Sequence, residues 1–288
     1  MSNFRGIWIA LATPFRADEI DFEGLERLVK KLLADGVAGF VVCGTTGEAA
    51  ALSPAEQLSV LDSVLSWVDP HQVVMGLSGN NLREILAFQE EIQKRELAGL
   101  LVPAPYYIRP SQAGLESFFM TVADAARVPV IVYDIPYRTG ARIARETLRK
   151  IVRHPQIAAV KDCGGDMETT MALIQDGAVQ VLAGEDSQLF NSLCLGGSGA
   201  ISASAHIRAD LYVKLHQQVD SGDLEGARLT HYQLLPWMQI AFAEPNPAVL
   251  KAALDLQGLT SADLREPMQA CTPATRVALT KVLSLLGA

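Results

Sequence analysis

Eight short apolar runs recur along the chain at nearly regular intervals, and longer stretches with helical periodicity separate them. Most of these runs are continuous in Val, Ile, Leu and Ala, which is typical of parallel strands covered on both faces. The predicted strands are residues 6–12, 39–43, 73–76, 99–102, 130–133, 157–160, 179–183 and 199–202.

The stretches between the strands carry helix signals at their ends. In residues 21–36 the apolar positions 22, 25, 28, 29, 32 and 33 form one face, with Asp21 as N-cap and Gly36 as terminator. A second helix is predicted to begin at Pro54, because Ser53 and Glu56 around it form a capping box. Strand and helix therefore alternate regularly.

Eight strand-then-helix units at this spacing predict a (β/α)₈ TIM barrel. The helix after the eighth strand ends near residue 221, and the rest of the chain predicts helices over 224–243, 247–257 and 275–286. We therefore expect a catalytic barrel over residues 1–222 and a C-terminal helical region over 223–288. A doubly wound open sheet is the alternative, although eight near-regular units suit closure better.

Composition and charge argue against several classes of function. The net charge of −8 and the absence of a Lys/Arg-rich run argue against a nucleic-acid partner. The apolar run near the N-terminus is too short to span a membrane. Four cysteines without a C-x-x-C pair favour reduced thiols in the cytoplasm, and the dispersed histidines and cysteines predict no metal site.

Polar residues gather after the predicted strands, where a barrel of this type carries its chemistry. These segments are Thr13-Pro14, "GTTGE" (44–48), Asn80, "PAPYY" (103–107), "YDIPYRTG" (133–140), Lys161 and "GEDS" (184–187). One end of the barrel should therefore collect hydroxyl groups, one lysine and one arginine.

Lys161 differs from the other lysines because it ends an apolar strand, in "IAAVKDCG". It could pair with Asp162 or reach water, or it could be a desolvated, partly neutral amine that attacks carbonyl groups. Its place at the catalytic end of the barrel favours the nucleophile. The other lysines fall in predicted amphipathic helices, where solvated charges are expected; they are Lys30, Lys31, Lys94, Lys150, Lys214, Lys251 and Lys281.

The remaining candidates each have a plain alternative. "GTTGE" is either a glycine-rich turn or a site where backbone N–H groups and the hydroxyls of Thr45 and Thr46 hold a carboxylate. Glu48 is expected to brace this loop. Tyr133 is either a core tyrosine or a proton carrier. Arg138 is either solvated or a fork for a carboxylate.

With these motifs in place, the chain resembles the dihydrodipicolinate synthase / N-acetylneuraminate lyase family of pyruvate-dependent class I aldolases. "GTTGE", "PYYIRPSQAGL", "YDIPYRTG", "VKDCGGD" and "GGSGAIS" occur in the family's order and spacing. The resemblance implies that Lys161 forms a Schiff base with pyruvate and that Tyr133 passes protons beside it. It also implies that this covalent imine takes the place of a separate cofactor.

The resemblance assigns further residues to the site. It implies that Thr45 and Tyr107 complete a hydroxyl relay, with Tyr107 supplied across a subunit interface. It implies that Thr46 holds pyruvate's carboxylate, and that Ile201 and the carbonyl of Gly184 line the pocket. A homo-oligomer, built as a tetramer from two tight dimers, is implied as well.

One arginine indicates which aldehyde is condensed with pyruvate as the acceptor substrate. Synthases of the family have an arginine in Y-x-x-P-x-R-T-G that grips the carboxylate of aspartate semialdehyde, and Arg138 matches it. The resemblance therefore implies a condensation of pyruvate with aspartate semialdehyde in lysine and diaminopimelate biosynthesis. Asp134 and Tyr137 depart from the usual pattern, so another pyruvate aldolase or a keto-sugar-acid dehydratase stays open. A keto-acid sensor without activity is a third hypothesis, against which the intact catalytic set argues.

Overall fold

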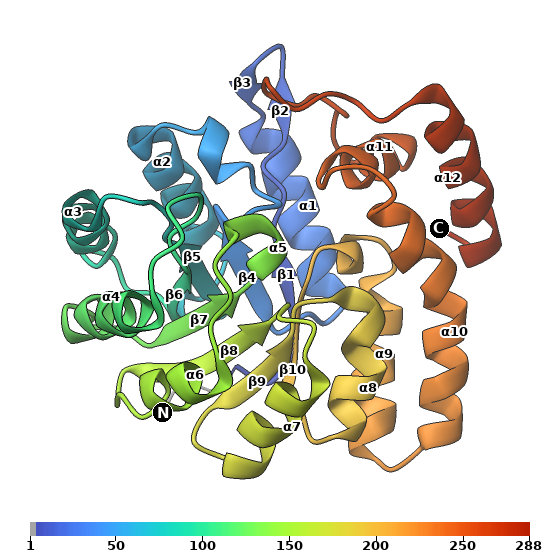
Figure 1. Ribbon diagram of the computed structural model, residues 1–288. Helices are drawn as coiled ribbons and strands as arrows, with labels where there is room; N and C mark the ends of the chain where they lie inside the picture. The colour runs from blue at the N-terminus through green and yellow to red at the C-terminus, as the bar shows by residue number, and fades with distance from the viewer. Residues whose placement is uncertain (1–3) are drawn as a thin grey trace.

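The computed structural model describes residues 4–288 and contains a closed barrel of eight parallel strands (Figure 1). Strand β1 pairs with β10 on one side and with β4 on the other, which closes the sheet. The barrel strands are β1 Gly6–Ala10, β4 Gly39–Val42, β5 Val73–Gly76, β6 Gly99–Pro103, β7 Val130–Asp134, β8 Ile157–Asp162, β9 Gln180–Ala183 and β10 Gly199–Ser202. The predicted barrel is confirmed, and the alternative of an open sheet is wrong.

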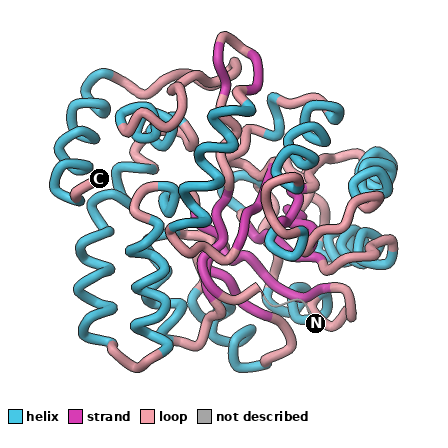
Figure 2. Tube along the Cα trace, turned by 180° about the vertical axis from the view of Figure 1, so that it is seen from behind, coloured by secondary structure: helices cyan, strands magenta, loops and turns pink. Residues whose placement is uncertain are grey.

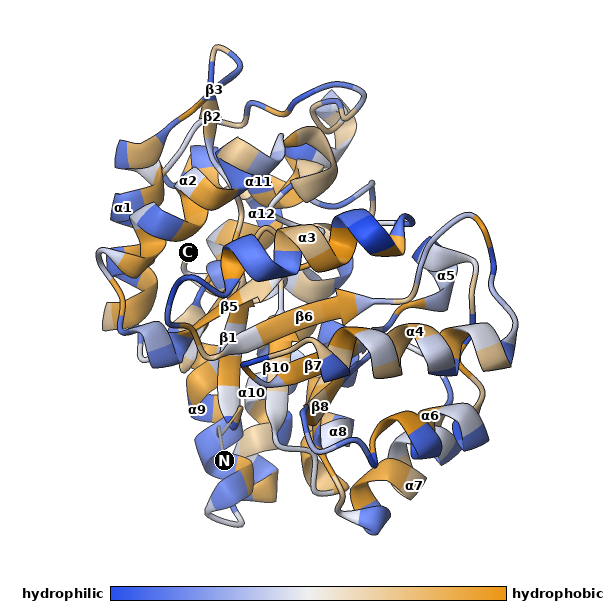
Figure 3. Ribbon diagram, turned by 90° about the vertical axis from the view of Figure 1, so that its left-hand side faces the viewer, coloured by the Kyte–Doolittle hydropathy of each residue, from blue (hydrophilic) through white to orange (hydrophobic). Residues whose placement is uncertain are grey.

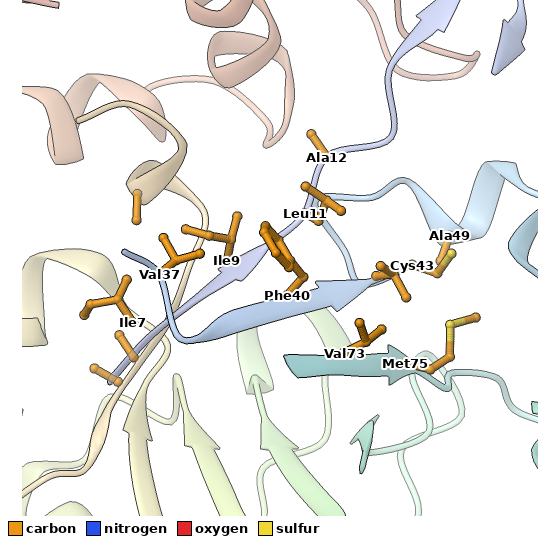
Figure 4. Packing of buried hydrophobic residues seen from close by; sticks show 14 of the residues in the cluster. Ile7, Ile9, Leu11, Ala12, Val37, Phe40, Cys43, Ala49, Val73 and Met75 are labelled. Atoms are coloured by element: carbon orange, nitrogen blue, oxygen red, sulfur yellow. The ribbon is translucent and has the colours of Figure 1, made fainter. Parts of the chain in front are cut away.

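The strands read as continuous apolar runs because each is buried on both faces. On β1, Ile7 and Ile9 face outward and pack with Phe40 of β4 and with Val37 just before it (Figure 4). Trp8 lies between them in sequence and faces the barrel interior. The carboxyl ends differ most from the predicted bounds in β1, which ends two residues early at Ala10, and in β8, which continues through Lys161 to Asp162.

The helices surround the barrel, and Figure 2 shows them outside the strands from behind. They are α1 Phe22–Ala34, α2 Pro54–Leu65, α3 Leu82–Ile92, α4 Gln112–Asp124, α5 Pro136–Thr139, α6 Arg145–Ile151, α7 Met167–Asp176, α8 Leu189–Cys194 and α9 Ala209–Asp220. Figure 3 shows apolar strands and mixed helix surfaces. The predicted caps are confirmed: Asp21 accepts from Gly24 N–H, and Ser53 and Glu56 form the capping box.

A short hairpin was not anticipated by the pattern. Strands β2 Phe15–Arg16 and β3 Glu19–Ile20 pair antiparallel after β1. The intervening Ala17 and Asp18 have φ angles of 50° and 72°, in the left-handed region. Two-residue strands are too short to show any periodicity, so sequence patterns do not detect them.

Three helices follow the barrel: α10 Leu224–Ala241, α11 Ala248–Leu256 and α12 Pro273–Leu286. Helix α10 packs along α9, and α12 packs on α10 and α11 (Figure 1). The division at residue 222 into a barrel and a helical region stays a prediction. Within residues 4–288, none of the helices has the length and apolar character needed to cross a membrane.

Candidate active site

Lys161 lies inside the barrel at the carboxyl end of β8, with 6% of its surface exposed. Its Nζ atom lies 4.2 Å from the centroid of the Tyr133 ring, and the two residues are register partners on β8 and β7. Burial lowers the pKa of Lys161, and the nearby Asp186 and Glu185 carboxylates partly offset this. The amine therefore lies in a dry environment that disfavours its charged form.

Asp162 does not pair with Lys161. The next residue along a strand points to the opposite face, and the Asp162 carboxylate accepts hydrogen bonds from Gly164 N–H at 2.8 Å and from the Thr170 hydroxyl. The alternative of a lysine simply paired with its neighbour is wrong.

Tyr133 and Thr45 form the polar pair beside the amine. Burial raises the pKa of Tyr133 well above its usual value, and a hydrogen bond from the Thr45 side chain opposes that shift. The phenol is thus neutral and able to donate a proton and take it back. The structure brings Lys161, Tyr133 and Thr45 together as the motifs predicted.

The loop Gly44–Glu48 follows β4 and is tightly folded. Its N–H groups at Gly47 and Glu48 donate to the carbonyls of Gly44 and Thr45, each at 3.1 Å. Thr46 is 2% exposed, and its Oγ1 accepts a hydrogen bond from Asn246 Nδ2 at 2.9 Å. The loop therefore presents Thr45 while Thr46 is held from behind by the C-terminal part of the chain.

Glu48 braces this loop, as expected, but its partner was not foreseen. Glu48 forms a buried ion pair with Lys251, which is 1% exposed. The prediction that Lys251 is a solvated helix charge is wrong. Helix α11 is buried along Ala248–Leu254, so its charged residue has no water-facing side to occupy.

A cavity of about 370 Å³ opens at the carboxyl ends of the strands. Tyr133, Thr45 and Arg138 lie on its wall, whereas Lys161 lies just behind, against the Tyr133 ring. Residues after the barrel close its other side; they are Asn246, Pro247, Arg265, Pro267 and Met268. No pattern in the sequence singled out these residues, although the resemblance to the family extends to "EPNPAVLKAAL" (244–254), which contains Asn246 and Pro247.

Gly184 and Ile201 lie near the interior side chains Lys161 and Tyr133 but not on the wall of this cavity within the described residues, so their pocket-lining role stays a prediction. A Cβ atom on Gly184 would collide with Cys163 Sγ and lie 3.0 Å from Lys161 Cγ, so the site needs a glycine there. Ile201 on β10 is 1% exposed and belongs to the same interior cluster as Tyr133. Both positions limit the space around the amine.

Tyr107 is not part of this cluster. It lies in the loop after β6, its side chain is 87% exposed, and its N–H donates to Thr139 O at 3.0 Å. It is absent from the wall of the cavity within the described residues. Its place in the hydroxyl relay stays a prediction that requires a second subunit.

Two contacts near the amine were not singled out from the sequence. Asp186 is 3% exposed and accepts hydrogen bonds from Ser204 N–H at 2.7 Å and from the Ser204 hydroxyl at 2.6 Å. Burial raises the pKa of the Tyr137 phenol in helix α5, and the nearby Glu185 carboxylate in the loop after β9 contributes to that shift. Both carboxylates belong to the "GEDS" segment, so their position at a strand end was the available signal.

The chain is similar to proteins of one family. The model of the dihydrodipicolinate synthetase family matches residues 3–286. The 4-hydroxy-tetrahydrodipicolinate synthases of Haloarcula marismortui and Methanocaldococcus jannaschii are 37% and 34% identical to it. These alignments cover 92% and 99% of this chain and 88% and 99% of the relatives. The crystal structure of dihydrodipicolinate synthase from Thermotoga maritima superposes with a TM-score of 0.93 at 32% identity, over 99% of each chain.

Proposed function

The chain belongs to the dihydrodipicolinate synthetase family, and we propose that Lys161 carries out the Schiff-base chemistry of its active site. The protein is a lyase that condenses pyruvate with L-aspartate 4-semialdehyde to give 4-hydroxy-tetrahydrodipicolinate, in lysine and diaminopimelate biosynthesis. The observation that carries the residue assignment is the buried Lys161 amine, 4.2 Å from the ring of Tyr133.

The first half of the reaction forms the imine. The neutral amine of Lys161 attacks the keto carbon of pyruvate, and the resulting hydroxyl leaves as water after it takes a proton. Tyr133, with Thr45 beside it, is the group that supplies and recovers this proton. The iminium draws electrons from the neighbouring methyl carbon and makes its hydrogens acidic, so no separate cofactor is required by this chemistry.

The second half forms the carbon–carbon bond. Loss of a methyl proton gives an enamine, whose carbon attacks the aldehyde of the acceptor, and the new alkoxide takes up a proton. Lys161 is released when its imine is hydrolysed or when the acceptor's own amine takes its place at that carbon. With the cyclic imine as product, the net change is the loss of one water molecule.

Substrate binding is divided between two sides of the cavity. Thr46 and the neighbouring N–H groups of the loop hold pyruvate's carboxylate, next to Thr45, whereas the N–H groups of Gly47 and Glu48 close the loop itself. Arg138 lies on the wall, in helix α5, and takes the carboxylate of the acceptor. In a chain with a net charge of −8, an anionic acceptor depends on such a local cation.

A different acceptor is the second candidate. Tyr137 lies near Glu185 and beside Arg138, and its phenol occupies space on the acceptor side that the motif's usual small residue would leave open. This arrangement favours, as the alternative, a keto-sugar-acid substrate whose hydroxyl groups can bind the Tyr137 and Glu185 side chains.

The assembly and location are also proposals. We propose a homo-oligomer, a tetramer made of two dimers, in which Tyr107 of one subunit completes the relay of another. The exposed run Tyr106, Tyr107 and Ile108 supports an interface at this loop. Four free cysteines support a cytoplasmic location.

The test combines trapping with turnover. Borohydride reduction in the presence of pyruvate should attach a pyruvate-derived group to Lys161, and aspartate semialdehyde should then be consumed with pyruvate. An adduct without turnover would move the search to sugar-acid acceptors. The absence of an adduct would overturn the Schiff-base mechanism and leave only a binding role.

A further inference from the structure

We propose that Lys251, in helix α11 outside the barrel, is a positioning residue for pyruvate binding, because it fixes the loop Gly44–Glu48 through the Glu48 carboxylate. This inference rests on the proposed role of that loop in holding pyruvate's carboxylate. It makes the helices after the barrel part of the active site.

The ion pair between Lys251 and Glu48 is buried among the residues that the structure describes. Lys251 and Glu48 are 1% and 5% exposed. The ammonium also donates to Asp263 O at 2.9 Å and lies 4.1 Å from the centroid of the Phe15 ring. Arg265 N–H donates to the other Glu48 oxygen at 3.3 Å. In this setting each charge depends on the other, since a buried charge without a partner is strongly unfavourable.

Glu48 is the residue at which the loop turns. Its φ angle of 53° lies in the left-handed region, which a glutamate adopts only when its surroundings hold it there. Its N–H closes the loop on Thr45 O, and its carbonyl accepts from Ala51 N–H at 2.8 Å. The side-chain anchor on Lys251 therefore holds the backbone that presents Thr45 and Thr46.

The same part of the chain makes a second contact with the loop. Asn246, just before α11, donates to Thr46 Oγ1 at 2.9 Å. After α11 the chain runs back toward the β2–β3 hairpin (Figure 1), where Arg265 Nη1 donates to Ala51 O at 3.0 Å. Helix α11 and its flanks thus hold the loop at Thr46, at Glu48 and just beyond it, while Lys161 is held independently by β8.

This separation gives the proposal a distinct kinetic signature. If the pair positions the carboxylate-binding loop, its loss weakens pyruvate binding more than it slows chemistry at saturating pyruvate. A pair that only docks α11 on the barrel would change the thermal stability without this selective effect.

The experiment compares Lys251→Met, Glu48→Gln and the double variant with the wild type. Each single variant leaves one buried charge unpaired, so we expect KM for pyruvate to rise about tenfold or more, with a smaller change in kcat. The double variant removes both charges and therefore relieves the unpaired buried charge, but it also lacks the anchor, so its KM for pyruvate should stay above that of the wild type. Lys281→Met, which removes an exposed lysine from α12, is the matched control and should leave KM unchanged.

Hydrogen exchange of the loop amides gives a second measurement that does not depend on catalysis. Without substrate, exchange at residues 44–48 should be faster in Lys251→Met than in the wild type and in Lys281→Met. An unchanged KM and unchanged exchange in a folded Lys251→Met would overturn the proposal. Where a single variant folds poorly, the folded double variant decides: a raised KM for pyruvate supports the proposal, and a KM equal to that of the wild type overturns it. Failure of the wild type to form a pyruvate adduct would overturn the proposed function instead, and the exchange result would still decide the loop's anchoring.

Discussion

The Lys161 amine and the Tyr133 ring are held together by strand register, with Nζ 4.2 Å from the ring centroid. Parallel strands in register direct equivalent side chains to the same face of the sheet. The proposed nucleophile and the proposed proton carrier are therefore positioned by the barrel backbone itself. Replacement of Lys161 should therefore remove the amine without disturbing the strands that place it.

Lys161→Ala should abolish the pyruvate adduct and reduce turnover by about 10³-fold or more, because no other amine replaces the nucleophile. The fold should persist, since the change removes a charge that the barrel interior solvates poorly. Intact-protein mass spectrometry after borohydride treatment measures the adduct, and circular dichroism checks the fold. Lys281→Ala on exposed α12 should behave as the wild type. An adduct of normal yield in Lys161→Ala would assign the chemistry to another residue.

The pH dependence of imine formation should report the pKa of Lys161. Burial lowers this pKa from its ordinary 10.5, and only the deprotonated amine attacks the keto carbon. The rate should therefore rise with pH through an apparent pKa below 10.5. The Asp186 carboxylate favours the charged amine, so Asp186→Asn should move the acid limb to lower pH. Single-turnover trapping across the pH range measures both curves, and a limb that stays in place in Asp186→Asn would show that Asp186 does not act on Lys161.

The barrel was predictable because its signal is local. Strands covered on both faces give continuous apolar runs, and the caps at Asp21 and Ser53 mark helix starts in a few residues. Lys161 stood out for the same reason, as one charge in an apolar strand. Such features need no knowledge of distant parts of the chain.

The C-terminal side of the site was not predictable from local patterns. Lys251 resembles an ordinary helix charge because the pattern does not show that α11 is buried from Ala248 to Leu254. Lys251 and its partner Glu48 lie about 200 positions apart in the sequence, and so do Asn246 and Thr46, which are joined by a hydrogen bond. Periodicity says nothing about such long-range pairings, so only the resemblance motif pointed to this segment.

Gly184→Ala should damage catalysis although it adds one methyl group. The new Cβ would collide with Cys163 Sγ and lie 3.0 Å from Lys161 Cγ, and a shift of the lysine stem displaces the amine. We expect kcat to fall by about 10²-fold, as for a displacement of about 1 Å at a reacting group. Gly114→Ala is the control, because it adds the same methyl group on helix α4, away from the amine. Its new Cβ would lie 3.3 Å from Pro110 Cβ, just before that helix. Equal kinetics for both variants would show that the barrel relaxes around the methyl group.

Arg138→Ala should separate acceptor binding from pyruvate binding. Arg138 lines the cavity from α5, whereas pyruvate's carboxylate is assigned to the loop after β4. Loss of a charge-assisted pair worth about 1.5–3 kcal/mol should raise KM for aspartate semialdehyde by about 10- to 100-fold. Trapping of pyruvate on Lys161 should be unchanged. Arg142→Ala, on the next stretch of the same segment but off the cavity wall, is the comparison variant. Unaltered acceptor kinetics in Arg138→Ala would favour the sugar-acid alternative.

His206 should make the protein sensitive to acid. It is fully buried, its Nε2 accepts from Ala12 N–H at 3.1 Å, and its Nδ1 contacts Ala203 O at 2.7 Å. A proton on Nε2 would face the Ala12 donor, and burial lowers the pKa of His206 from 6.5 to about 4. Between pH 6.5 and about pH 4, His206 therefore binds the proton in the unfolded chain but not in the folded chain. Stability therefore falls as the pH drops through this window, by about 3 kcal/mol for this group.

Asp134 acts in the opposite sense over much of the same range. Burial and the nearby Asp162 raise the pKa of Asp134 to about 7, so the folded state takes up its proton first and gains stability as the pH falls. The total pH profile of the wild type therefore hides the His206 contribution. The difference between the wild type and His206→Gln isolates it, because Asp134 is present in both. Urea unfolding above pH 6.5 and near pH 4 should show the variant gaining about 3 kcal/mol relative to the wild type on acidification. His71→Gln, which removes a mostly exposed ring, should show no such gain; a gain of equal size there, or none in His206→Gln, would contradict the assignment.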